Sequence, residues 1–571
     1  MRYGDLSDFA VLPLSCLAIL LIMFMRYAGK HGSSLWDSDP RRTTPSHRKH
    51  ERNFFPVRRW MLFGSHLQGI VTVGAIFLPS ICLTFGWLPA LMLLTVGVLF
   101  SGWVHDYASI ILSVRSEGED LPSLFGRLMG KRCGSAFWLL GVFCALSLSS
   151  LSALQCAIIL EKYPSSLIST IVILLSGALF ALLFYYRRFR FPVAMVSSLG
   201  VVLLGVGFSS IVPFKGLDKI VIISILYLIA LLYAIAPSRY LSQSVGFVAS
   251  IPTLIVIAYM LIISLLSSLI TPPSVSAFIV PSSDPLTMLD SFWSAFLLSS
   301  ACGIVSGWHG LIGSSVTARH VDLETDVDVI GVGSMFVESA LALGSLLVYA
   351  SMSSKTIFAS STPWEALIKG LSRQIEGIVG EGDLTLLLIS LVATLLVVCC
   401  INSLRLAISL WKPNQNGVDK RGKRRLGIFF VLACLSMSWF LTYSSSLADL
   451  WFIFAGVNQL LASLVLMLAA IFLKRSGKRI LGTIIPSILL AMNSLAFLTY
   501  LGAWRFLNAL EFDDLFGSSV FSKSFSGAVD LVFLTALSLL SATIGIWLIF
   551  KTLNTLSLRT SDQNQGRSLP S

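Results

Sequence analysis

Long apolar stretches fill this chain, and polar residues gather in the short segments between them. A helix that spans a bilayer needs about 20 predominantly apolar residues, and stretches of this kind recur along most of the sequence. They predict roughly fifteen membrane-spanning helices, near residues 9–25, 60–84, 87–113, 135–160, 166–186, 192–212, 219–236, 246–270, 291–312, 330–352, 384–410, 426–443, 449–473, 480–502 and 527–550. The expected fold is an all-α polytopic membrane protein.

The segments between these stretches are too short to bury a separate soluble core. We therefore expect one transmembrane domain over residues 1–551 and a polar cytoplasmic tail over 552–571. Apolar residues at helical spacing over 364–378 predict an amphipathic helix, lying either in the outer membrane interface or on an ordinary protein surface. The acidic run at 322–328 is expected to be a solvated inner loop.

Composition strengthens the membrane assignment and fixes an orientation. Hydrophobic residues make up 55% of the chain and charged residues 12%, with a mean hydropathy of +0.83, which excludes an ordinary soluble enzyme. The net charge is +12, and 31 of the 41 Lys and Arg residues fall on the inner side if the N-terminus is outside and the C-terminus cytoplasmic. This asymmetry follows the positive-inside rule, so the charge indicates topology and contact with the lipid bilayer rather than a nucleic-acid partner.

Two groups of polar residues interrupt the early spans. His66 and Gln68 lie among glycines in FGSHLQG, which predicts either a discontinuous helix that exposes backbone groups to a substrate or tight helix packing. His105 and Asp106 are adjacent in the third span. Such a pair is a candidate proton relay, or else an interfacial cap.

The richest group is the sequence SGWHGLIGSS. Its polar members are Ser306, His309, Ser314 and Ser315, interleaved with glycines. This pattern favours a broken helix lining a cavity. Glu338 in the next span is a single carboxylate at membrane depth, expected to be either a proton-coupling acid or the partner of a buried base.

Three further polar residues lie within late spans. Asn458 and Gln459 are adjacent in an apolar helix, where they are candidates for substrate binding or for hydrogen bonds between helices. Arg405 is the only basic residue inside a predicted span, so it needs a counter-charge, an anionic substrate or access to the inner face. No cysteine or histidine spacing suggests a metal site or a disulfide framework, and we expect no cofactor.

The sequence resembles the carbon starvation (CstA) family over most of residues 26–475. The matching pieces keep their order along the chain: DPRRTTPSHR (39–48), RRWMLFGSH (58–66), FGWLPALMLLTVGVLFSGWVHDY (85–107), SGWHGLIGSSVTARHVDLETD (306–326), VGSMFVESALAL (332–343) and LWFIFAGVNQLLASLVL (450–466). The resemblance implies a multi-pass inner-membrane uptake system for peptides or pyruvate, made when carbon is scarce, with proton coupling proposed for pyruvate. It also implies an architecture like that of the amino-acid/polyamine/cation transporters (LeuT-like), which bind substrate between broken helices.

The chain departs from the family pattern at polar positions. Ser65 stands where the family usually has a first His, and Arg239 stands where it has an Asp. The usual Leu-Asp-Thr-Ala-Thr-Arg segment is CINSLR here, with Arg405 kept and its acid replaced. These differences leave the substrate and the coupling ion, protons or sodium, open.

The leading hypothesis is a secondary active transporter rather than an enzyme. The sequence has no G-x-x-x-x-G-K-[ST] motif that would supply energy from ATP, so an ion gradient is the expected drive. The alternatives are a membrane-embedded enzyme acting on lipid, for which His105 and Asp106 would supply acid–base chemistry, and a homologous transporter with a different small-molecule substrate.

Overall fold

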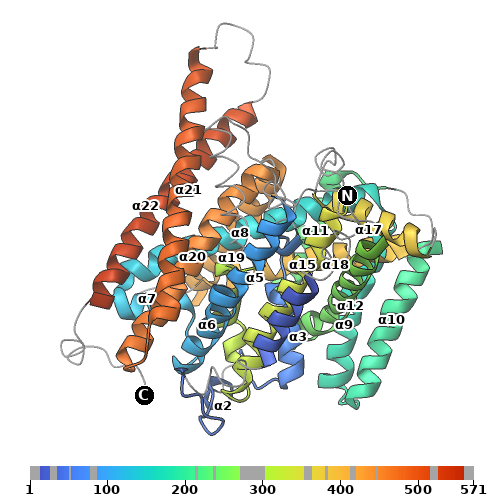
Figure 1. The fold of residues 1–571 in the computed structure, drawn as a ribbon, viewed down its shortest axis with the longest axis horizontal. Coiled ribbons are helices and arrows are strands. Elements are labelled where there is room, and N and C mark those ends of the chain that lie inside the picture. Colours follow the sequence, from blue (N-terminus) through green and yellow to red (C-terminus); the bar gives the residue numbers. More distant parts are fainter. Residues whose placement is uncertain are drawn as a thin grey trace.

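The computed structural model describes residues 13–25, 35–49, 53–76, 86–211, 216–235, 240–270, 303–352, 363–379, 384–411, 420–444, 447–514 and 525–557. Within these residues the regular elements are helices (Figure 1). Among the described residues there is one isolated β-bridge, between Thr43 and Leu323.

The described helices fall into four groups along the chain. The first group comprises Pro13–Met25, α2 (Pro45–Arg48), α3 (Arg59–Ile70), α5 (Trp87–Gly97), the π-helical turn η2 (Val98–Gly102), α6 (Trp103–Arg115), α7 (Leu121–Met129) and α8 (Lys131–Lys162). The second comprises α9 (Ser166–Ala181), η3 (Leu182–Tyr186), α10 (Phe191–Ile211), α11 (Lys219–Ile235) and α12 (Leu241–Ile270). The third comprises α14 (Gly307–Ser315), η4 (Thr317–Arg319), η5 (Asp328–Val332), α15 (Gly333–Ala350), α17 (Pro363–Val379) and α18 (Leu384–Ser409). The last comprises α19 (Lys420–Ser444), α20 (Leu447–Arg475), α21 (Leu481–Asp514) and α22 (Phe525–Ser557).

Eleven helical segments of the described residues are long and apolar enough to cross a membrane. This confirms the all-α polytopic class, while the number of roughly fifteen spans stays a prediction. The helix α22 continues to Ser557, past the start of the expected tail, and residues 558–571 lie outside the described part.

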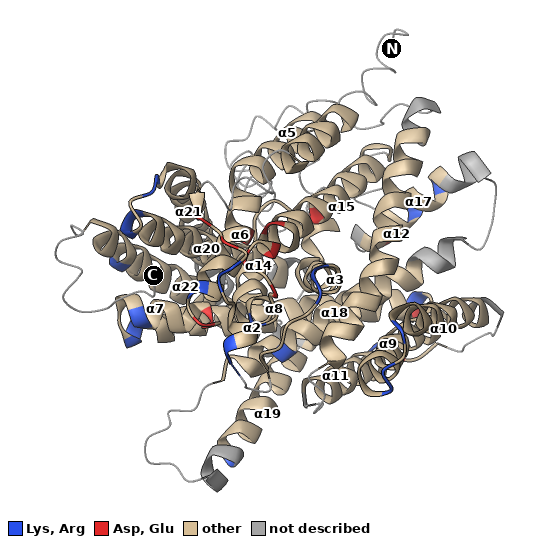
Figure 2. Cartoon of the chain, turned by 90° about the horizontal axis from the view of Figure 1, so that it is seen from below, with Lys and Arg blue, Asp and Glu red and all other residues tan. Residues whose placement is uncertain are grey.

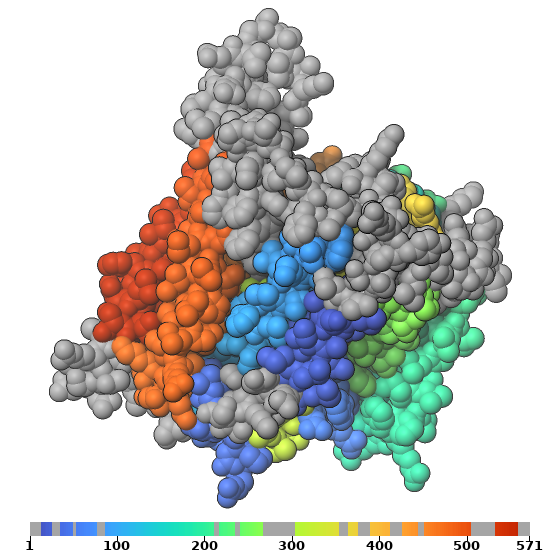
Figure 3. Space-filling view, in the orientation of Figure 1, coloured from blue at the N-terminus to red at the C-terminus, as the bar shows by residue number. Residues whose placement is uncertain are grey.

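Three helices form the centre of the bundle. Almost all of the apolar stretch of α8, α18 and α20 is buried by other helices, whereas most of that of α10 and α19 is exposed. Exposed Val196, Leu203 and Leu204 on α10 are typical of a helix facing lipid. In the space-filling view, α21 from the end of the chain lies beside α5 and α6 from its beginning (Figure 3).

Two of the expected spans contain non-helical residues among those that the structure describes. Within the expected span 60–84, α3 ends at Ile70 and the chain is non-helical at Val71 and Thr72. Within the expected span 291–312, the described residues 303–306 before α14 are non-helical, and Gly303 has a φ of +88° that favours glycine. Helices broken inside the bundle expose backbone N–H and C=O groups to the interior, so the predicted discontinuity is confirmed.

The amphipathic segment 364–378 is a helix, α17. Its apolar residues Trp364, Leu367 and Leu371 are buried, and α17 packs on α12 and α15. The stripe therefore contacts protein, and its predicted position parallel to the membrane stays a prediction.

Candidate functional site

The fully buried side chains of four predicted residues form one cluster between three helices. On α6, His105 Nδ1 lies 2.9 Å from Asp106 Oδ1. The Asp106 Oδ2 atom lies 2.9 Å from His309 Nδ1 on α14, and His309 Nε2 lies 2.9 Å from Glu338 Oε2 on α15. His309 thus bridges two carboxylates, and the pair His105 and Asp106 belongs to the same network rather than to a solvated cap.

Glycines let α14 approach its neighbours closely enough to build this cluster. A Cβ at Gly313 would lie 2.6 Å from Ser109 Oγ on α6, and one at Gly307 would lie 2.4 Å from the backbone oxygen of Asn458 on α20. Side chains at these positions would force the helices apart. The glycines that suggested a broken helix therefore also serve close packing around His309.

His66 and Gln68 point from α3 to different neighbours. His66 Nδ1 lies 2.8 Å from Thr317 Oγ1, and His66 is near enough to Asp106 and His309 to interact with both electrostatically. Gln68 Oε1 accepts a hydrogen bond of 2.7 Å from Thr253 Oγ1 on α12. The free His66 Nε2 and Gln68 Nε2 atoms are buried without a hydrogen-bond partner among the described residues.

Asn458 holds the beginning of α14 in place. Its Oδ1 accepts hydrogen bonds from Ser306 Oγ at 3.1 Å and from the backbone N–H of Trp308 at 2.8 Å. The neighbouring Gln459 is also fully buried on α20. Of the two roles predicted for Asn458, substrate binding and hydrogen bonding between helices, this geometry matches the second. The hydrogen bonds join α20 to the beginning of α14.

The two serines at the end of α14 differ in environment. Ser314 Oγ donates to Gly310 O at 2.8 Å within the same helix, so its hydroxyl is satisfied locally. Ser315 Oγ is buried without a hydrogen-bond partner among the described residues, and it lines a cavity.

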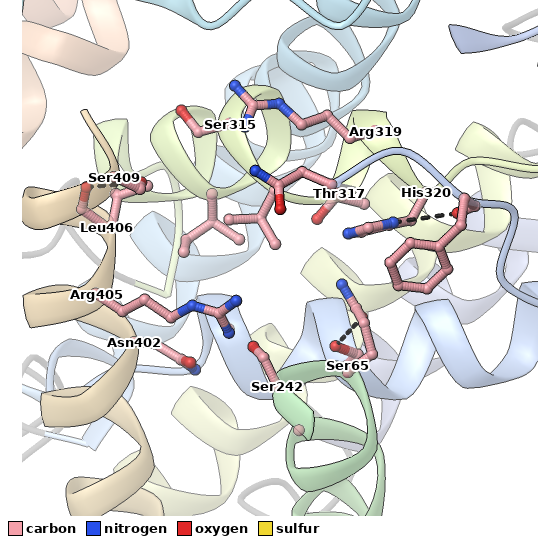
Figure 4. A pocket seen from close by; sticks show the side chains of 17 residues that line it. Ser65, Ser242, Ser315, Thr317, Arg319, His320, Asn402, Arg405, Leu406 and Ser409 are labelled. Carbon is pink, nitrogen blue, oxygen red and sulfur yellow. Dashed lines mark hydrogen bonds between the residues drawn. The ribbon is translucent and has the colours of Figure 1, made fainter. Parts of the chain in front are cut away.

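This cavity has a volume of about 120 Å³ and lies between α3, α12, α14 and α18. Figure 4 shows its polar side chains converging from these elements, with Arg405 reaching in from α18. The polar and charged residues of the lining are Asn53, Ser65, Ser242, Gln243, Ser315, Thr317, Arg319, His320, Asn402, Arg405 and Ser409. Thr317 belongs both to this lining and to the hydrogen bond with His66, which connects the cavity to the buried cluster.

Sequence reasoning missed most of the cavity. Arg405 was identifiable as a base inside an apolar stretch, and Ser65 as a departure from the family pattern. Ser242, Gln243 and Asn402 give no such signal, because serine and amide residues are common in membrane helices and only the fold brings them together.

The acidic run 322–328 packs against the basic segment 39–48, and its carboxylates other than the half-exposed Asp322 are buried. Glu324 is fully buried, and its carboxylate accepts bonds from Arg42 Nη1 at 2.8 Å and from Arg115 Nε at 2.8 Å. The expectation of a solvated loop is therefore wrong for Glu324, because two arginines from distant segments replace its water. Burial also lowers the pKa of nearby His320 to about 3, so this side chain of the cavity is neutral at physiological pH.

No group of three or more potential metal ligands with suitable geometry is found in the described ranges. The contacts of the buried cluster instead suit proton exchange, since His309 lies between two carboxylates that can give or take a proton.

Fold and site together define a polytopic helical membrane protein whose discontinuous helices enclose a polar, charged interior. The model of the family described as carbon starvation protein CstA matches residues 9–382, and the chain belongs to this family.

Named relatives are about a quarter identical to the chain over the aligned residues. The pyruvate/proton symporter BtsT of Escherichia coli is 25% identical over 385 residues, which cover 64% of this chain and 52% of the relative. The peptide transporter CstA of Bacillus subtilis is 24% identical over 560 residues, covering 89% of this chain and 92% of the relative. The chain spans about half the length of several curated relatives that it matches.

Solved structures also align with the chain. A mutant of the Eremococcus coleocola manganese transporter aligns with a TM-score of 0.47 and 14% identity, covering 87% of this chain and 95% of that one.

Proposed function

We propose that the protein is a proton-coupled secondary transporter that imports a small carboxylate such as pyruvate, or a peptide, across the inner membrane when carbon is scarce. Membership of the carbon starvation family supports this proposal. So do the names of two relatives, one a pyruvate/proton symporter and the other a peptide transporter.

The observation that carries the proposal is the buried bridge from Asp106 through His309 to Glu338. With both carboxylates ionised and His309 protonated, the three groups carry one net negative charge. Uptake of one proton makes them neutral, and a neutral cluster is far less costly to keep away from water. A conformational change that opens the cluster to one side of the membrane can therefore load or release a proton.

The connection to the cavity supplies a route for coupling. Thr317 lines the cavity and contacts His66, which in turn interacts with Asp106 and His309. The breaks after Ile70 and before Gly307 lie in the two segments that carry His66 and His309. A shift of either segment changes both the cavity and the cluster, which is what coupled transport requires.

The predicted site residues take different roles in this proposal. His309, Glu338, His105 and Asp106 carry the proton, while Asn458 and Ser306 hold the broken end of α14. His66 links the two parts. Gln68, Ser314 and Gln459 support the surrounding helices, and Ser315 faces the substrate.

A membrane enzyme acting on lipid is less well supported. Its acid–base pair would have to reach a lipid or water interface, but His105 and Asp106 are fully enclosed by other helices.

We place the C-terminus in the cytoplasm and the N-terminus outside. Viewed from below, many described Lys and Arg residues gather around α2, α7 and the turn between α9 and α10 (Figure 2). A face rich in basic residues is the one that the positive-inside rule assigns to the cytoplasm.

Transport into proteoliposomes with an imposed proton gradient tests the function. Labelled pyruvate and labelled dialanine are supplied as separate substrates, one from each candidate class. We expect accumulation of the transported substrate when the outside is acidic, and accumulation to stop when a protonophore is added. Glu338→Gln should retain substrate exchange but lose accumulation driven by the gradient. Glu161→Gln, an exposed carboxylate at the end of α8, is the matched control and should behave like the wild type.

Two outcomes would contradict the proposal. The first is accumulation that follows a sodium gradient and ignores a proton gradient. The second is unchanged gradient-driven uptake by Glu338→Gln.

A further inference from the structure

The cavity next to α18 is positively charged. Its lining contains Arg405 and Arg319, together with the neutral His320, and no carboxylate. Arg319 is already engaged, since its Nη2 lies 3.7 Å from Asp120 Oδ2 and its Nε donates to Gly118 O at 3.3 Å. The charge that remains available in the cavity is that of Arg405.

Arg405 has no carboxylate within ion-pair distance in the described part of the chain. It lies one turn before the end of α18, half-buried among helices, with its guanidinium directed into the cavity (Figure 4). A base in this position is costly unless an anion accompanies it. The guanidinium has a planar fork of N–H donors that matches a carboxylate in two parallel hydrogen bonds.

Neutral polar groups surround this charge. Ser315 is 4% exposed, and its Oγ has no hydrogen-bond partner among the described residues. Asn402 lies one turn before Arg405 on α18, and Ser242 faces it from α12 (Figure 4). These hydroxyl and amide groups can bind a second oxygen of the ligand, such as a keto or hydroxyl oxygen beside the carboxylate.

The size of the cavity limits the ligand. A cavity of about 120 Å³ suits a small ligand. Pockets for drug-sized ligands are larger, about 300–1,000 Å³. A peptide also carries an ammonium group, and the lining has no carboxylate to receive it.

We propose that this cavity is the substrate site, that it binds a small monocarboxylate of two to four carbons through Arg405, and that it excludes peptides. The inference rests on the proposed transport function and names its substrate class and binding residue. Within this site, Arg405 binds the carboxylate, and Ser315 and Asn402 bind the adjacent oxygen.

Direct binding to the purified full-length protein in lipid nanodiscs tests the site without requiring transport. Isothermal titration would use pyruvate, propionate, dialanine and inorganic phosphate as separate probes. We expect pyruvate to bind more tightly than propionate, which lacks the second oxygen, and dialanine not to bind. Phosphate binding tighter than pyruvate binding would overturn the carboxylate assignment.

Substitutions identify the residue that binds. Arg405→Gln should weaken pyruvate binding by about 10- to 100-fold, the usual effect of losing a hydrogen-bonded charge. Arg405→Lys keeps the positive charge but loses the planar pair of N–H donors. Its affinity for pyruvate should therefore lie between those of the wild type and Arg405→Gln. The matched control is Arg425→Gln, an exposed arginine at the start of α19, which should bind pyruvate like the wild type.

Arg405→Gln is expected to fold, because it removes a costly charge from the membrane interior. An unchanged thermal unfolding midpoint would verify this, and Ser315→Ala provides a second, smaller change that should weaken pyruvate binding without altering propionate binding. Equal pyruvate affinity in Arg405→Gln and wild type would overturn the site. Pyruvate binding that depends on Arg405 without any proton-driven uptake would instead support the site and contradict the transport function.

Discussion

At the scale of single residues, the interior of this protein is organised around charges that have no access to water. Asp106, His309 and Glu338 are each fully buried, and each has a partner of complementary chemistry. Such residues depend on one another, because removing one partner leaves a buried charge uncompensated.

This dependence predicts that His309→Ala lowers stability as well as transport. The substitution leaves Asp106 and Glu338 facing each other without a cation, a loss of about 3–5 kcal/mol for a broken buried pair. Thermal unfolding of the purified protein in detergent measures this change.

Removing the carboxylates should reverse the effect. The triple variant Asp106→Asn, His309→Ala and Glu338→Gln is expected to recover most of the lost stability, although it does not transport. His47→Ala, which breaks a half-exposed pair with Asp322, is the control and should cost about 1 kcal/mol at most. A His309→Ala variant as stable as the His47→Ala control would show that the cluster is not held together by charge.

At the scale of elements, α14 is the short helix on which the site depends. It packs against α6 on one side and α20 on the other, and glycines occupy the positions of closest approach. This close approach lets Ser306 contact Asn458 on α20 and His309 contact Asp106 on α6.

We expect Gly313→Ala to destabilise the protein by about 1–3 kcal/mol, the usual cost of overpacking. Its Cβ would lie 2.6 Å from Ser109 Oγ and 3.0 Å from Ile110 Cγ1, so these side chains or the two helices must shift. Thermal unfolding is the measurement, and Ser109→Ala should restore part of the loss. Gly200→Ala on α10 is the control, because a Cβ there meets nothing within 4 Å. The close-packing argument fails if the two alanine variants are equally stable.

At the scale of the whole molecule, distant segments of the chain close one end of the bundle. Arg42 from the first connecting segment and Arg115 from the end of α6 both bind Glu324, which follows α14. The basic residues around α2 lie on this same face (Figure 2).

The proposed orientation places this face in the cytoplasm, and it can be tested on intact cells. A protease site and tag added after residue 571 should be protected from external protease and become accessible only after the cells are permeabilised. A tag added before residue 1 should show the opposite behaviour. External cleavage of the C-terminal tag on intact cells would reverse the orientation and the assignment of the inner face.

The sequence by itself determined the class of the fold and most of its elements. Apolar stretches set the helices, because a backbone in lipid must satisfy its own hydrogen bonds. Residues such as His309, Glu338 and Arg405 were recognisable because polar groups at membrane depth are costly and therefore rare. The resemblance to the carbon starvation family supplied the expected transport function and substrate classes.

Only the tertiary structure decided which of these residues meet. His105 and Asp106 are adjacent in sequence, but their contact with His309 depends on the packing of α14 against α6. The burial of Glu324 and the convergence of Ser65, Ser242 and Asn402 around Arg405 are likewise decided by contacts between distant segments. The hydrophobic pattern determines which stretches enter the membrane. It does not determine how a helix is rotated or which helices it contacts, because the lipid around it is as apolar as its own surface. The rotation and the contacts follow from the close packing of small residues and from the pairing of buried polar groups.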